Sequence, residues 1–182
     1  MKLLYPKLRR SQLPAMSGIT LLGGLLGGIY GAIHDWFTYS ISSEYYTRMK
    51  FDQFSHVDMG FPPRLFAAQI GFIAAGAAGL AAAWFIARTA VPIWPARVAL
   101  QKSMRAFLLM ILIATAAAVV GNFIGLKTNI GEWLWKDLCK SLGVTNVPAF
   151  LRVALIHTAG YLGALAGLIV AILRLRRAAH QS

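Results

Sequence analysis

The stretch LFAAQIGFIAAGAAGLAAAWFIA, at residues 65–87, decides the fold of this chain. It contains no Asp, Glu, Lys or Arg, and it exceeds the roughly 20 residues that a helix needs to cross about 30 Å of hydrocarbon. Three more uncharged apolar runs occupy residues 13–33, 106–126 and 153–173. The sequence therefore predicts an all-α, polytopic membrane protein, in which a four-transmembrane-helix bundle forms a single membrane domain over residues 1–182.

The composition of the chain excludes other classes of protein. Hydrophobic residues make up 58% of the sequence and charged residues only 13%, which is wrong for an ordinary soluble domain. A net charge of +12 could indicate nucleic-acid binding, but the basic residues gather at the ends of the apolar runs instead of covering one face of a domain. We therefore expect the lipid bilayer as a partner, and no nucleic acid.

The distribution of charge predicts how the chain is oriented. All six acidic residues, with seven basic ones, lie in the second and fourth polar segments, 34–64 and 127–152. The other three polar segments carry eleven basic residues and no acidic one: Lys2, Lys7, Arg9, Arg10, Arg88, Arg97, Lys102, Arg105, Arg174, Arg176 and Arg177. Because Lys and Arg near helix ends favour the cytoplasmic side, the sequence predicts a multi-pass protein of the bacterial inner (plasma) membrane. Both termini are then cytoplasmic, and the loops at 35–64 and 127–152 face the periplasm or the exterior.

Small residues at a spacing of four predict how the helices pack, because membrane helices associate through close backbone approach. The first run has Gly23, Gly27 and Gly31, and similar patterns occupy the second and fourth runs. The small residues of the third run are an alanine-rich patch and Gly121, with Gly125 near its end. We expect the first, second and fourth helices to pack tightly and the third to be peripheral. A glycine face that serves as a homodimer contact remains an alternative.

Helix-capping signals mark the segments that follow. Ser42 is typical of an N-cap, and Glu44 complements the helix dipole in the next turn. A short interfacial helix is therefore predicted over residues 43–54, in the first outer loop. Asn146, just ahead of Pro148, predicts the start of the fourth long helix.

The most specific string in the chain is YGAIHDWFTYSISSEY, at residues 30–45. It resembles Y-G-x-x-H-D-x-x-T-Y-x-I-S-x-E-Y, the pattern of a family of small bacterial four-pass membrane proteins for which no activity is established. The likeness extends to KFDQF at residues 50–54 and HTAGYLG at residues 157–163. Ser43 and Tyr46 depart from the residues that are usual at these positions in that family, Pro and Phe. The resemblance implies a four-pass fold and no particular activity.

Ionisable residues inside or beside the apolar runs are the candidate site. His34 and Asp35 end the first run, and His157 lies about one turn inside the fourth, so both histidines are expected at a similar depth near the outer face. Charged or titratable groups at membrane depth are costly and usually functional. The ligand or metal candidates are His34, Asp35, Glu44 and His157, and the supporting residues are Tyr39, Asn122 and Tyr161.

Three functions remain open from these residues. The first is binding of a divalent metal, a polar ligand or a partner protein, since imidazole and carboxylate suit zinc, iron or manganese. The second is a membrane-embedded enzyme that uses His34 with Asp35 or Glu44, although no catalytic motif can be recognised from the spacing. The third is an accessory or assembly subunit of a larger membrane complex, without a site of its own. Besides the bilayer, the partners that remain open are another membrane protein or further copies of this chain in a homo-oligomer. A haem is disfavoured, because His34 lies near the interface beside a carboxylate.

Overall fold

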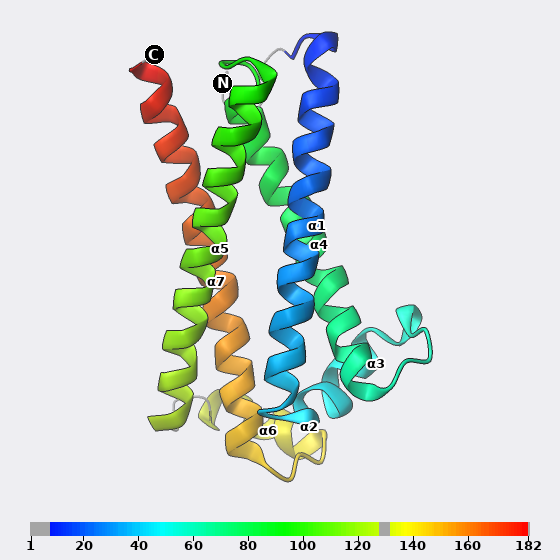
Figure 1. Ribbon diagram of the computed structural model, residues 1–182. Coiled ribbons are helices and arrows are strands. Elements are labelled where there is room, and N and C mark those ends of the chain that lie inside the picture. The colour runs from blue at the N-terminus through cyan, green and yellow to red at the C-terminus, as the bar shows by residue number, and fades with distance from the viewer. Residues whose placement is uncertain (1–7, 128–131, 182) are drawn as a thin grey trace.

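The computed structural model describes residues 8–127 and 132–181, with side chains from residue 135 onward in the second range. Four long helices dominate these residues: α1 (Leu13–Tyr39), α4 (Pro63–Ala90), α5 (Ala96–Lys127) and α7 (Val147–His180). Each is long and apolar enough to cross a membrane. The predicted all-α, four-helix membrane fold is thus confirmed, and the chain is a multi-pass membrane protein (Figure 1).

The bundle has two distinct ends, which Figure 1 places at the top and bottom of the view. The terminal end holds the start of α1 with the short η1 (Arg10–Gln12), the connection between α4 and α5, and the end of α7. The loop end holds the short helices α2 (Ser43–Tyr45), η2 (Tyr46–Lys50), α3 (Phe51–Gln53), η3 (Ser55–Val57) and α6 (Glu132–Ser141). The described basic residues of the first, third and last polar segments lie at or near the terminal end. Lys2 and Lys7, and the side chain of Glu132, fall outside the described part.

The capping predictions are confirmed. Ser42 Oγ accepts a hydrogen bond from the Tyr45 amide at 3.3 Å and begins a continuous helical segment that ends at Gln53. Asn146 Oδ1 accepts one from the Ala149 amide at 3.2 Å at the start of α7. The sequence did not predict that η2 is a π-helical turn, a feature that often accompanies functional sites.

The helices associate as two tight pairs, α1 with α4 and α5 with α7, which contact one another much less. A Cβ atom added at Gly79 would lie 2.6 Å from the carbonyl oxygen of Gly23, so α1 and α4 touch through their backbones. A Cβ added at Gly121 would lie 2.6 Å from the Leu155 carbonyl, so α5 and α7 do the same. The predicted peripheral position of the third helix is therefore wrong. The alanines of α5, with Gly121 and Gly125, are small enough for this close approach, because α7 supplies the remaining glycines.

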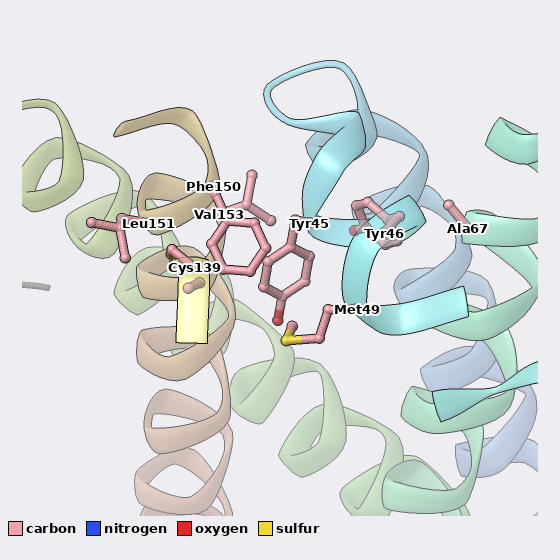
Figure 2. Close-up of a cluster of buried hydrophobic side chains, with 9 residues drawn as sticks. Tyr45, Tyr46, Met49, Ala67, Cys139, Phe150, Leu151 and Val153 are labelled. Atoms are coloured by element: carbon pink, nitrogen blue, oxygen red, sulfur yellow. The ribbon is translucent and has the colours of Figure 1, made fainter. Parts of the chain in front are cut away.

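A buried aromatic cluster joins the first loop to the base of α7. Figure 2 shows Tyr45 beside Phe150 of α7, with Met49 close to the tyrosine ring and Tyr46 on the side toward Ala67 of α4. The Tyr45 and Phe150 ring centroids are 5.3 Å apart. This cluster packs the segment Ser43–Gln53 against the bundle, next to the polar side chains of the candidate site.

Candidate functional site

Three of the predicted residues converge inside the bundle. Asp35 Oδ1 lies 3.1 Å from His34 Nδ1 and 3.1 Å from His157 Nε2. One nitrogen from each histidine and one carboxylate oxygen all lie within 4.8 Å of one another. His34 and Asp35 belong to α1 and His157 to α7, so the group links the two helix pairs.

Small residues on α4 make room for this group. Asp35 and His157 are buried, and Asp35 packs where α1 crosses α4. A Cβ atom added at Gly71 would lie 2.8 Å from Asp35 Cγ, so any larger residue there would displace the carboxylate. Gly71 therefore positions Asp35 toward His157, since α4 offers it no side chain to pack against.

The hydrogen bonds of His157 determine which atom of its ring is free. Nδ1 lies 2.9 Å from the carbonyl oxygen of Val153. A carbonyl oxygen can only accept, so Nδ1 carries a proton and donates it there. In a neutral ring Nε2 then presents a lone pair, and this lone pair faces the Asp35 oxygen. Two acceptors 3.1 Å apart need a cation to hold them together, either a shared proton or a metal ion.

Aromatic rings cover the group on the side of the loops. The Tyr45 ring stacks on His157 with centroids 5.0 Å apart, and the His34 and His157 rings meet edge to face at 4.9 Å. The Tyr46 hydroxyl lies 2.6 Å from Thr38 Oγ1. Burial raises the pKa of both tyrosines, and the nearby Asp35 carboxylate adds to the effect. Both hydroxyls therefore stay protonated, and their rings limit the access of water from the loop end.

Glu44, the fourth ligand candidate, lies apart from the three. Its Oε1 accepts hydrogen bonds from the Thr145 amide at 2.9 Å and the Thr145 hydroxyl at 2.8 Å, and Oε2 accepts one from the Asn146 amide at 2.7 Å. These bonds lower the pKa of Glu44, the two backbone amides having the largest effect. Its carboxylate fastens α2 to the segment that precedes α7, a contact between residues a hundred positions apart.

The supporting residues also divide between site and scaffold. Tyr161 contacts the His157 ring, with centroids 6.0 Å apart. Asn122 instead accepts a hydrogen bond from Arg152 Nε at 2.8 Å, which links α5 to α7. The Tyr39 ring lies 5.6 Å from the Tyr46 ring and 5.5 Å from the Arg64 guanidinium, at the surface of the loop segment.

Sequence reasoning missed several residues next to the site. Tyr30 lies 5.9 Å from the His34 ring, and its hydroxyl accepts a hydrogen bond from Thr115. The Lys50 ammonium lies 5.8 Å from the centroid of the Tyr45 ring, and burial lowers its pKa while the charge of Asp35 opposes that change. Tyr30, Tyr45 and Lys50 all lie close in sequence to His34 and Asp35, within residues 30–50, and this proximity is the signal that could have found them.

A cavity of about 500 Å³ begins at the three site residues and extends between the helix pairs. All four long helices line it, almost entirely with apolar groups such as Gly27, Ala78, Met110 and Ala164. Along α7 it extends from His157 to Leu168, a rise of eleven residue steps, which is about 16 Å of helix. The polar group therefore lies at one end of a long apolar space.

This cavity is not closed, because Tyr161 and Leu165 line it and are exposed on α7. Molecules from the surroundings of the bundle can therefore fill it. Water is a poor filler, because it needs polar partners that these walls lack. Apolar matter is the remaining filler.

Comparison with protein-family models, with curated proteins and with solved structures gave no match for this chain. What the site can do is therefore inferred from its own geometry and chemistry.

Proposed function

We propose that this membrane protein binds a divalent transition-metal ion through His34 Nδ1, Asp35 Oδ1 and His157 Nε2. The observation that carries the proposal is the bond from His157 Nδ1 to the Val153 carbonyl, because in the neutral ring this bond leaves the Nε2 lone pair aimed at the carboxylate. Metal-binding histidines usually donate their second ring nitrogen to such an acceptor, which fixes the tautomer and the ring orientation.

The two distances from the carboxylate to the nitrogen atoms fit one ion, and all three ligand atoms lie within 4.8 Å of one another. With bonds of about 2.0–2.2 Å, two neighbouring ligand atoms of one metal ion lie about 3.0–3.5 Å apart. Both nitrogen atoms lie 3.1 Å from Asp35 Oδ1. Two imidazoles and one carboxylate suit zinc or iron, and three protein ligands leave at least one coordination position for a further molecule.

Metal analysis of the purified protein tests this proposal. We expect about one zinc per chain after purification with Zn²⁺, and near-total loss of zinc in His157→Ala and Asp35→Asn. His56→Ala is the matched control, since His56 is exposed and stacks only on Phe54 among the described rings. Co²⁺ substitution gives a second readout, because its visible spectrum reports nitrogen and oxygen ligation. Wild-type protein that holds no zinc or cobalt would refute the proposal and favour a shared proton, with an accessory role in a larger complex.

A membrane-embedded enzyme is the second candidate, and the cavity favours it. The cavity reaches all three metal-competent residues, so a molecule inside it could meet the open position of the ion. In that case Asp35 and His34 stand beside the reacting groups. Glu44 would have only a structural role, because its carboxylate already accepts hydrogen bonds from backbone amides.

We also propose the placement of the protein in the cell. The excess of Lys and Arg at the terminal end supports cytoplasmic termini in the bacterial inner membrane, with the loop end facing the periplasm or the exterior. The metal centre would then lie near the outer face. The resemblance of residues 30–45 to the bacterial four-pass family supports the same assignment.

A further inference from the structure

We propose that the cavity holds the single hydrocarbon chain of an anionic lipid, whose carboxylate or phosphate head meets the metal centre. The position of the head rests on the proposed metal function, whereas the position of the chain rests on the cavity alone. Nothing in the family resemblance implies a lipid ligand.

The dimensions of the cavity match one lipid chain. Its extent of about 16 Å along α7 is close to half of the roughly 30 Å hydrocarbon thickness, which is the depth that one leaflet offers to a lipid tail. Its volume of about 500 Å³ lies within the range of about 300–1,000 Å³ that is usual for ligand pockets. The polar residues line the cavity near the loop end of the bundle, so a lipid whose chain follows α7 would bring its head group to them.

The mouth of the cavity faces the lipid. Tyr161 and Leu165 line the cavity, yet they are 62% and 58% exposed on a membrane-spanning part of α7. A residue that both lines a cavity and is exposed there stands at its opening. A hydrocarbon chain can therefore enter sideways from the bilayer without passing through water.

The polar end of the cavity favours an anionic oxygen head. The metal centre, as proposed, keeps an open position beside the three ligands, and oxygen anions bind divalent ions well. All three ligand residues line the cavity, so the open position faces its interior. A neutral lipid would fill the same apolar space, but its head group would bind the metal centre less tightly.

Native mass spectrometry of the zinc-loaded, delipidated protein tests the proposal with three probes: oleate, oleoyl lysophosphatidate and the neutral monoolein. We expect one bound lipid per chain, with both anionic probes at least about tenfold tighter than monoolein. Preference for oleate over lysophosphatidate, or the reverse, then distinguishes a carboxylate from a phosphate source. Equal affinities of all three probes in the zinc-loaded protein would overturn the assignment of the head.

Variants that fill the cavity test whether the hydrocarbon chain of the lipid lies there. Ala78→Phe and Ala164→Phe place a ring in the cavity from α4 and from α7, and should weaken oleate binding at least about tenfold. Ala77→Phe and Ala166→Phe are the matched controls, since both residues are exposed and neither lines the cavity. Equal binding by the filled and control variants, with normal thermal unfolding, would refute the proposal. Zinc is measured in every sample. Its absence from the wild type, with oleate binding still lost in the filled variants, would refute the metal function alone.

Discussion

Replacing Gly27 by alanine should destabilise the protein, whereas the same replacement at Gly18 on the same helix should not. A Cβ atom at position 27 would lie 2.6 Å from the Ala75 carbonyl oxygen and 3.1 Å from Gly79 Cα. These are backbone atoms of α4, so α1 and α4 must separate to relieve the overlap. At Gly18 a Cβ atom would meet nothing within 4 Å.

The two replacements should have different effects on the free energy of unfolding. Overpacking of this kind costs about 1–3 kcal/mol, while alanine in an exposed helix position gains up to about 1 kcal/mol over glycine. We therefore expect Gly27→Ala to lose about 2 kcal/mol and Gly18→Ala to be neutral or slightly stabilised. Gly125 is unsuitable as a control, because a Cβ there would lie 2.9 Å from Arg152 Cα.

Unfolding of the detergent-purified variants, followed by tryptophan fluorescence during a denaturant titration, measures this difference. The free energy of unfolding is compared with that of the wild-type protein prepared in the same detergent. A Gly27→Ala variant as stable as Gly18→Ala would mean that α1 and α4 do not touch through their backbones. The close packing that places Asp35 over Gly71 would then lose its support.

The remaining predictions concern the site, the loop and the topology. Asp35→Ala and His157→Ala should be non-additive in stability, since each removes the partner of the other; additive effects in a double-mutant cycle would deny their contact. Glu44 has a lowered pKa in the folded protein, so its contribution is complete above the usual carboxyl pKa and is lost as the pH falls through the lowered value. Wild-type stability should therefore decrease more steeply than that of Glu44→Gln below about pH 5, and parallel curves would exclude this contribution. A reporter that is active only outside the cytoplasm should work when fused after Asp58 and fail after Arg97, and the opposite result would reverse the orientation.

Part of the site could be predicted because helix geometry fixes depth. His34 and Asp35 end one apolar run and His157 begins another, so their similar depth follows from counting residues along helices. Their contact across 122 positions also needed both helices to turn these side chains inward, which the cost of polar groups in lipid favours. Proximity in sequence predicts that Glu44 joins them. The structure turns it toward Thr145 instead, because the start of α7 offers unpaired amides that a carboxylate can satisfy.

The sequence by itself determined the class of the protein, its four membrane helices and the caps at Ser42 and Asn146, because these depend on local length, hydropathy and capping residues. Only the tertiary structure decided that α5 pairs with α7, that Tyr45 lies on His157 and that a long apolar cavity separates the two helix pairs. Small residues occur on several faces of these helices, so their spacing permits more than one partner. Which helices pair depends on how well their whole surfaces fit together. That fit involves two helices at once, so it cannot be read from either apolar run alone.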